Sequence, residues 1–247
     1  MVTITFHGNL KELLDAWHRD SGVMSFTLDR RASIKDVVES CGVPHPEIAG
    51  ITVNGAEVDF ACLVSPDDRI DVEPIAPPFD VLSPSLLRPQ PLPDIRFAVD
   101  VNVGKLASLL RMLGFDTLYQ KDLPDSELAT AAVREARILL TRDRRLLKRK
   151  IITFAHLIRA IDPVQQLRET IDLFQIAERI RPFSRCLRCN GILIEVAKND
   201  IIHRLEPLTI KYYHRFHTCQ DCGQIYWQGS HQENMRKLLR QLQLTPE

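Results

Sequence analysis

The sequence has no apolar run approaching the roughly 18 to 20 residues that a membrane-spanning helix requires, which excludes an anchor of that kind. Its start also lacks a basic segment followed by an apolar one, so we expect no signal peptide and a cytoplasmic location. Internal repeats and low-complexity tracts are absent. The composition is that of an ordinary globular protein, and 247 residues suffice for two or three small domains.

The net charge of zero hides an uneven distribution. Residues 1–77 carry 6 Lys and Arg against 13 Asp and Glu, whereas residues 78–247 carry 26 against 19. The chain therefore has an acidic head and a basic body. A basic body favours a polyanionic partner, of which nucleic acid is the commonest.

Six cysteines in a chain without an export signal indicate metal binding or simple burial rather than disulfides. Cys41 and Cys62 stand alone, and we expect them to be small buried hydrophobes. The segments CLRC and CQDC each place two thiolates on one turn, and two such turns can complete the tetrahedron that zinc prefers. A closed site of four thiolates leaves no coordination position open, so the zinc is expected to be structural; four free cysteines in a reducing compartment are the alternative. The predicted zinc ligands are Cys186, Cys189, Cys219 and Cys222.

The first 77 residues have the pattern of a β-grasp domain. VTITF and MSFTLD alternate apolar and polar residues as strands do, and residues 33–42 predict a helix with Ser33 as its N-cap. Asn54 and Gly55 indicate a hairpin, and RIDVEP a last strand. TITFHGNLKELL, the helix and the VNG turn resemble the ubiquitin-like sulfur carriers of molybdopterin and thiamine synthesis. Those carriers act through a free C-terminal Gly-Gly, whereas this chain continues, so we predict a docking or stabilising domain.

Prolines crowd residues 78–94 and predict a stiff linker. From residue 95 to residue 180 strands and helices alternate, which predicts an α/β domain with a parallel sheet. The expected strands are 95–101, 115–120, 137–141 and 151–154, and the expected helices are 103–114, 125–136, 142–150 and 162–176.

Ligands of a parallel sheet gather at the carboxyl ends of its strands. Asp100 ends the first strand, Asp125 opens the helix after the second, and Asp143 follows the third, whereas Asp116 belongs to the opposite edge. Carboxylates held together repel one another, and magnesium or manganese would relieve that repulsion. Asp125 and Asp143 could instead be helix N-caps. The basic run over residues 134–150 favours the metal site, because it supplies phosphate contacts beside it.

DVNVGKLASLLRMLGFDT, DSELATAA, RILLTRDRRLL, RCLRCNG and CGQIYWQGSH, in this order, resemble the PIN-like ribonuclease family named for the C-terminal domain of the exonuclease Mut-seven. In bacteria this family is accompanied by a ubiquitin-like domain. The resemblance covers about residues 95–235 and implies a PIN-like fold, a zinc ribbon in residues 181–247, and magnesium or manganese at Asp100, Asp125 and Asp143. It implies Asn102, Thr141 and Arg142 as supporting residues; Glu127 is the first candidate for a fourth acid and Asp122 the second. The family often has His in place of Asn102, and Arg in place of Lys105 and Ser108. The predicted nucleic-acid-binding residues are Lys105, Arg111, Arg142, Arg144, Arg145 and Lys148.

We therefore predict a metal-dependent ribonuclease that hydrolyses RNA phosphodiesters and leaves a 3′-hydroxyl and a 5′-phosphate. One alternative is a non-catalytic RNA-binding protein acting on tRNA or the ribosome; another is an adaptor whose acidic head recruits a basic partner. A basic helix is expected at residues 234–244. Aromatic residues of the ribbon either stack on bases or form its core, and nearby histidines contact nucleic acid or pack rather than bind zinc. These residues are Tyr212, Tyr213, Phe216, Tyr226 and Trp227, and His214, His217 and His231.

Overall fold

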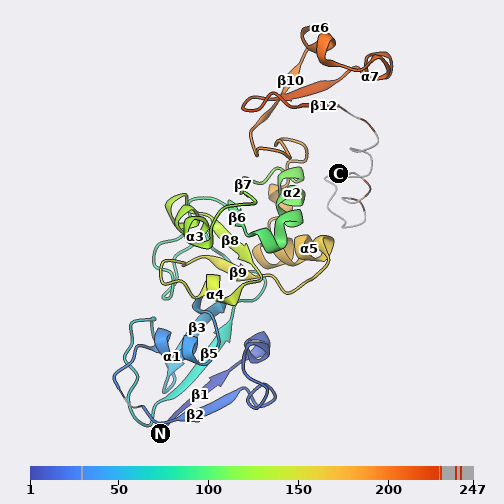
Figure 1. Ribbon diagram of the computed structural model, residues 1–247. Helices are drawn as coiled ribbons and strands as arrows, with labels where there is room; N and C mark the ends of the chain where they lie inside the picture. Colours follow the sequence, from blue (N-terminus) through green and yellow to red (C-terminus); the bar gives the residue numbers. More distant parts are fainter. Residues whose placement is uncertain (29, 228, 230–236, 238–239, 241–247) are drawn as a thin grey trace.

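Three parts follow one another along the chain and in space: the head (residues 1–77), the central domain (residues 95–180) and the ribbon (from residue 181) (Figure 1). The computed structural model describes residues 1–28, 30–227, 229, 237 and 240. His231 and most of the helix predicted at 234–244 lie outside them. Among the described residues, no helix has both the length and the apolar character needed to cross a membrane.

The head is a β-grasp domain, as predicted. Its sheet has the order β2-β1-β5-β3-β4, with β1 and β5 parallel and the other pairs antiparallel. The alternation of VTITF buries every second residue of β1. Ser33 caps the helix by accepting a hydrogen bond from the Asp36 N–H, and Asn54 and Gly55 form the expected turn with positive φ angles. The elements are β1 (Val2–Phe6), η1 (Gly8–Leu13), β2 (Val23–Phe26), α1 (Ile34–Ser40), η2 (His45–Glu47), β3 (Ile48–Val53), β4 (Ala56–Glu57) and β5 (Arg69–Pro74).

The central domain has a wholly parallel sheet of order β7-β6-β8-β9. Apolar residues of α2 and α5 belong to one core cluster, and those of α3 and α4 belong to another, so helices cover both faces. The elements are β6 (Phe97–Val99), η3 (Val101–Val103), α2 (Gly104–Met112), β7 (Thr117–Leu118), α3 (Asp125–Arg134), β8 (Ile138–Thr141), α4 (Arg144–Leu147), β9 (Ala155–Leu157), α5 (Pro163–Phe174) and η4 (Ala177–Arg179).

Two predicted elements of this domain differ from the structure. The last strand was expected at residues 151–154 but forms at β9, where Ala155 pairs with Leu139. Apolar residues run almost unbroken from 151 to 158, so the pattern does not fix the register, which pairing with β8 sets instead. The helix expected at 142–150 shrinks to the four residues of α4.

The proline-rich segment, residues 78–94, is not the stiff linker that the sequence predicted. It contains no helix or strand, but Val81, Leu87 and Leu92 are buried, and two of them belong to the core cluster of α2 and α5. The segment is therefore a strap across the central domain. Burying its apolar side chains against the domain is favourable in free energy, whereas an exposed linker would leave them in water.

Arg88 fastens this strap to the head. Its guanidinium is buried and donates hydrogen bonds to the carbonyl oxygens of Ile48 (2.9 Å) and Pro46 (2.8 Å). Burial lowers the pKa of Arg88 to about 10, partly opposed by the negative charge of Glu47. The strap thus holds the head against the central domain.

A buried network of charges completes the contact between head and central domain. Glu47 accepts from the Leu157 N–H (2.8 Å), lies 3.0 Å from His156 Nδ1, and pairs with Arg159 Nη1 at 3.0 Å. His156 Nε2 lies 2.9 Å from Glu169. Burial alone would lower the pKa of His156, but the two carboxylates outweigh it and raise that pKa to about 9. The same contacts lower the pKa of Glu47 and of Glu169, although burial alone would raise both.

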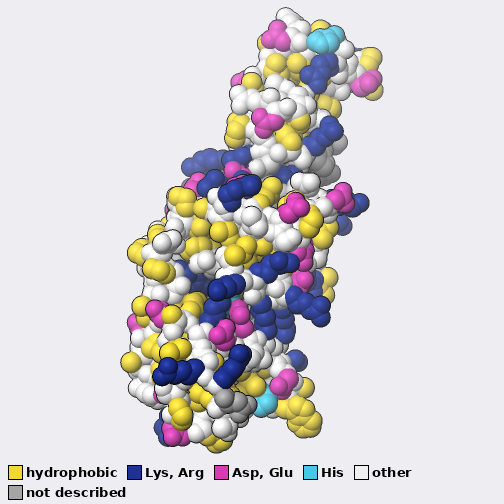
Figure 2. All heavy atoms as spheres, turned by 60° about the vertical axis from the view of Figure 1, so that its left-hand side comes forward, with side chains coloured by type: hydrophobic (Ala, Val, Ile, Leu, Met, Phe, Trp, Pro, Cys, Tyr) yellow, Lys and Arg dark blue, Asp and Glu magenta, His cyan; other side chains and the backbone are white. Residues whose placement is uncertain are grey.

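The ribbon has an antiparallel sheet of order β10-β11-β12 over a small core of Ile201, Phe216 and Ile225. Seen as a solid, it forms a narrow lobe on a broad body that carries many Lys and Arg side chains (Figure 2). The elements are β10 (Leu193–Val196), α6 (Lys198–Ile201), η5 (Ile202–Arg204), α7 (Pro207–Tyr212), β11 (Phe216–Cys219) and β12 (Ile225–Trp227).

Candidate nuclease site and zinc centre

Asp100 is the buried centre of the predicted acidic edge. It follows β6, is only 4% exposed, and accepts a hydrogen bond on Oδ1 from the Val101 N–H (2.6 Å). Its Oδ2 accepts from Asn102 Nδ2 and from the Thr141 hydroxyl, both at 2.6 Å. These donors stabilise a carboxylate and fix its direction.

Thr141 links Asp100 to the second acid of the edge. Its hydroxyl accepts from the Asp143 N–H at 2.9 Å while donating to Asp100. Asn102 adds a second link, because its Oδ1 accepts from the Arg142 N–H at 3.1 Å. The ends of β6 and β8 are therefore tied together by side chains, and Asp100, Asn102, Thr141 and Asp143 form one hydrogen-bonded group.

Asp143 has a capping role as well. Its Oδ1 accepts from the Arg145 N–H at 2.7 Å at the start of α4, as the alternative interpretation expected. Asp125 occupies the first turn of α3 without a side-chain cap bond, and Pro124 is the N-cap residue. Capping therefore accounts for one contact of Asp143 and for none of Asp125.

The third acid and the candidates for a fourth lie further out. Asp125, Glu127 and Asp122 are exposed. Among the described residues, the only group of three or more His, Cys, Asp or Glu side chains with ligand atoms within 4.8 Å of one another is formed by cysteines. The structure brings Asp100 and Asp143 together through shared partners, but it does not close the three carboxylates into a tight cage.

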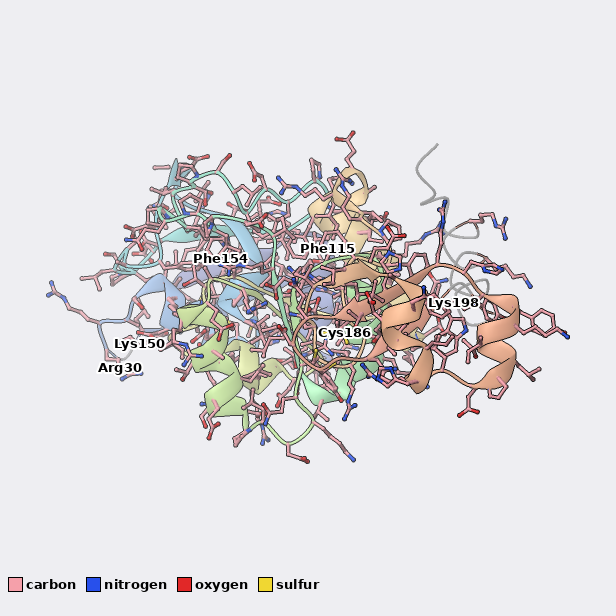
Figure 3. The ribbon with its side chains drawn as sticks, turned by 90° about the horizontal axis from the view of Figure 1, so that it is seen from above. Arg30, Phe115, Lys150, Phe154, Cys186 and Lys198 are labelled. Carbon is pink, nitrogen blue, oxygen red and sulfur yellow. The ribbon has the colours of Figure 1, made fainter. Side chains whose placement is uncertain are left out.

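The predicted phosphate-binding residues divide into three groups. Lys105, Arg142 and Arg145 are exposed. Arg144 and Lys148 contact the head: Arg144 donates to the Leu13 carbonyl (3.0 Å), and Lys148 donates to the Glu39 carbonyl (2.7 Å). Figure 3 labels Lys150, just beyond α4, whose carbonyl oxygen accepts from Lys35 of the head.

Arg111 is the third case, and its prediction as a nucleic-acid-binding residue is wrong. Its side chain is buried, with Nε and Nη2 donating to the Thr117 carbonyl. Its Nη1 donates to the carbonyls of Leu187 and Arg188, both at 3.1 Å. Arg111 therefore joins the ribbon to the sheet. A guanidinium on a helix can serve either purpose, and the pattern alone does not distinguish them.

Arg159 was missed by the sequence interpretation. It lies just beyond the carboxyl end of β9, and hence on the same edge as Asp100 and Asp143. Because the strand was placed four residues too early, residue 159 was not assigned to this edge. Its pairing with Glu47 shows that the head reaches this edge of the sheet.

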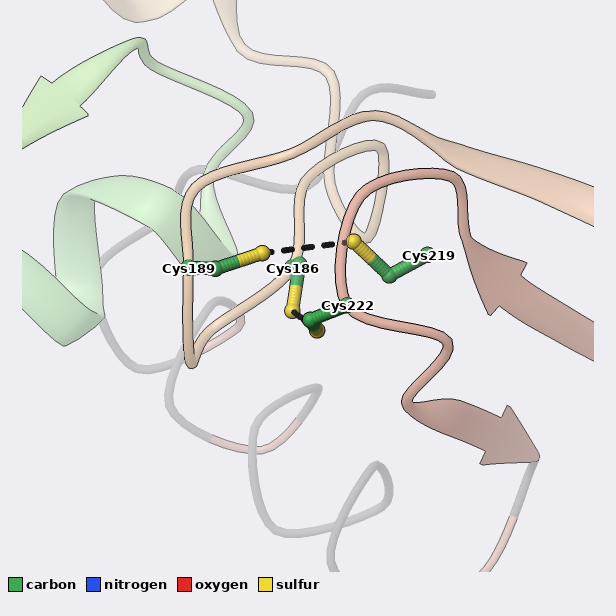
Figure 4. A group of neighbouring side chains, drawn as sticks. All are labelled: Cys186, Cys189, Cys219 and Cys222. Atoms are coloured by element: carbon green, nitrogen blue, oxygen red, sulfur yellow. Dashed lines mark hydrogen bonds between the residues drawn. The ribbon is translucent and has the colours of Figure 1, made fainter.

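The four cysteines converge as predicted (Figure 4). The four Sγ atoms all lie within 4.8 Å of one another. Cys186 and Cys189 precede β10, Cys219 is the last residue of β11, and Cys222 follows it. The thiol of Cys186 contacts the Tyr226 hydroxyl at 3.1 Å. Burial alone would raise the pKa of Cys186, but hydrogen bonds from Tyr226 and from backbone groups lower it to about 6. Four sulfurs with an anion-stabilising neighbour are positioned to bind a metal, and zinc fits this set.

The ribbon aromatics divide into buried and exposed side chains. Phe216 is fully buried and forms the core, and Tyr226 supports the zinc site. Tyr212 and Trp227 are exposed, Tyr213 packs partly against the core, His214 is exposed and His217 is half-buried. Tyr212 and Trp227 are therefore the aromatic side chains available for stacking.

A β-grasp head, an α/β domain with a parallel sheet, and a four-cysteine ribbon together define the class of this multidomain protein. A family model described as the Mut7-C RNAse domain matches residues 95–239, and one described as Mut7-C ubiquitin matches residues 1–80. The chain belongs to the Mut7-C RNAse domain family and carries the ubiquitin-like domain at its N-terminus. Neither the search of curated proteins nor that of solved structures finds a match.

Proposed function

We propose that this protein is a metal-dependent ribonuclease whose reaction takes place at the edge formed by Asp100, Asp143 and Asp125. The observation that carries the proposal is the network around Asp100, in which three donors aim one buried carboxylate beside a second acid. The family match supports RNA as the substrate.

The residues fit magnesium or manganese. Both ions prefer carboxylate oxygens and retain several waters, so a tight protein cage is not required. Asp100, Asp143 and Asp125 are the residues that would hold the ion. When bound, the ion supplies a nucleophile from water at neutral pH and neutralises charge on the phosphate.

The chain's own residues would position the RNA. Arg142 and Arg145 are exposed next to Asp143, and Lys105 extends from the first turn of α2, so three cations flank the acidic edge. Arg142 donates to the Ala160 carbonyl, which holds it near the end of β9. Cleavage by water at the phosphorus would leave a 3′-hydroxyl and a 5′-phosphate.

Asp143→Asn tests the proposal most directly. Asparagine still accepts the hydrogen bond from the Arg145 N–H, so α4 should begin as before, whereas the negative charge is lost. We expect cleavage of single-stranded RNA and of tRNA to fall at least about 100-fold in magnesium and in manganese. Asp172→Asn, at an exposed position of α5, is the matched control. Equal cleavage by both variants, each folded and zinc-loaded, would refute the site.

Thr141→Val tests the link between the two acids. The substitution keeps the shape of the side chain but removes the hydroxyl that joins Asp100 to Asp143. We expect cleavage to fall about 10- to 100-fold and the metal concentration for half-maximal activity to rise. Thr170→Val is the control, because Thr170 is equally buried but bonds only within α5. A similar loss in both variants would mean that the effect is one of stability.

The competing function is RNA binding without catalysis, on tRNA or the ribosome. The exposed Tyr212 and Trp227 of the ribbon favour it, because they offer stacking surfaces apart from the acidic edge. It predicts salt-sensitive RNA binding by wild type and by Asp143→Asn alike, with no metal-dependent cleavage by either.

A further inference from the structure

A small polar cavity of about 270 Å³ lies at the opposite edge of the parallel sheet, where the central domain meets the ribbon. Arg96 precedes β6 and Asp116 precedes β7, so the cavity faces the amino ends of the strands. Arg185, immediately before the first zinc ligand, forms the wall on the ribbon side. Figure 3 labels Phe115, which contributes an apolar wall.

Positive charge dominates the cavity. Arg96, Arg179 and Arg185 face it, against the two carboxylates of Asp94 and Asp116. Asp94 pairs with Arg179, at 3.3 Å on the surface. The other carboxylate, that of Asp116, lies 3.7 Å from Arg185 of the lining and is also neutralised from outside the cavity.

That neutralisation comes from the sheet and from the ribbon. Asp116 Oδ1 accepts from Arg137 Nη1 at 2.5 Å and from Asn190 Nδ2 at 2.8 Å. Burial alone would raise the pKa of Asp116, but these partners lower it. Arg137 does not itself line the cavity and also pairs with Glu135 at 2.8 Å, so it offsets only part of the charge of Asp116. Arg179 and Arg185 each pair with a carboxylate of the lining, which leaves Arg96 as the lining arginine without a carboxylate partner among the described residues.

Arg96 carries the second observation. Its Nε is buried and has no hydrogen-bond partner among the described residues. Because Nε is buried, a ligand in the cavity would meet the outer nitrogens of the Arg96 guanidinium, which pair with no carboxylate among the described residues. Guanidinium groups match the oxygens of phosphate in particular.

We propose that this cavity binds a phosphate of the RNA backbone, as a second contact for the substrate of the acidic edge. The identity of the nucleic acid rests on the proposed function; the phosphate chemistry does not. β6 and β8 are 3 and 4 residues long, and at roughly 3.3 Å per residue only about 10 to 13 Å of sheet separate the two edges. Helices cover both faces of the sheet, so an RNA strand that contacts both edges has to pass around the domain, over a path longer than this length.

The test is equilibrium binding of a labelled single-stranded RNA by zinc-loaded protein without magnesium or manganese, at several salt concentrations. Arg96→Gln and Arg179→Gln are the variants; Arg179 is half exposed, so its replacement should leave the fold intact. Arg168→Gln, exposed on α5, removes the same charge away from both edges. We expect each cavity variant to bind about 3- to 10-fold more weakly, and the slope of log affinity against log salt to fall by about 0.7 per lost contact.

The inference would be overturned if the cavity variants had the same affinity and the same salt slope as Arg168→Gln. It would also be overturned if the wild type did not bind RNA. The same RNA with a 5′-hydroxyl or a 5′-phosphate should bind equally; tight binding of the phosphorylated form alone would contradict a backbone contact. The nuclease proposal is judged separately, by cleavage with Asp143→Asn. A negative result for the cavity does not refute the nuclease proposal, and a negative result for cleavage does not refute phosphate binding by the cavity.

Discussion

Removing zinc is expected to unfold the ribbon while the parallel sheet and the head stay folded. Among the described residues of the ribbon, the core cluster has three buried apolar side chains, Ile201, Phe216 and Ile225, too few to order this part of the chain. Structural zinc sites contribute on the order of 10 to 16 kcal/mol, and that contribution is lost with the ion. Cys219→Ser should have the same effect, because it removes one of four ligands.

Tryptophan fluorescence and amide exchange measure this loss. Trp17 is 92% exposed and belongs to the head, which should stay folded when zinc is removed. A change in emission therefore reports on Trp227 of β12. Amide protons of β10 and β11 should exchange rapidly in Cys219→Ser and stay protected in Cys62→Ser, which alters a cysteine of the head that is remote from the cluster. If Cys219→Ser kept one bound zinc and the amide protection of β10 and β11, Cys219 would not be a zinc ligand.

Glu47→Gln is expected to destabilise the whole protein by about 3 kcal/mol, because it leaves the charge of His156 and Arg159 buried with one carboxylate fewer. The amide of glutamine can still accept from the Leu157 N–H, so the loss reports on charge rather than on shape. Urea unfolding compares this variant with Glu57→Gln, an exposed position of β4 that should change the free energy of unfolding by less than about 0.5 kcal/mol.

The same network sets a pH dependence. The pKa of His156 rises from its ordinary 6.5 to about 9 on folding, so its contribution is complete below about pH 6.5 and lost as pH rises through 9. Glu47 and Glu169 have lowered pKa values, so their contribution is present above about pH 4.5 and lost in acid. We expect the wild type to lose about 3 kcal/mol between pH 6.5 and 9.5, since one pKa unit is worth about 1.4 kcal/mol. In Glu47→Gln the decline should be smaller; an identical decline would exclude His156 as its source.

The sequence predicted the three parts and the zinc ligands because each depends on local pattern. Alternation over residues 2–6 produces a strand, and two Cys-x-x-Cys turns produce a metal site, wherever they lie in a fold. The grouping of Asp100 with Asp143 followed from one topological rule, that parallel strands end at a common edge.

The errors have a common cause in contacts between parts distant in sequence. Arg111 donates to carbonyls 76 and 77 residues away, so its role is not visible in the neighbouring residues. The strap was predicted to be a linker because it is rich in proline. Val81 and Leu92 are buried because they pack in the core cluster of α2 and α5, and these helices lie later in the sequence.

The separation of Glu47 from His156 by 109 residues has a consequence for biosynthesis. At roughly 5 to 20 residues per second, the ribosome delivers the head some 5 to 20 s before the histidine that Glu47 pairs with. During this interval Glu47 has neither His156 nor Arg159 to pair with. The part of the contact between head and central domain that depends on this network therefore forms late in synthesis.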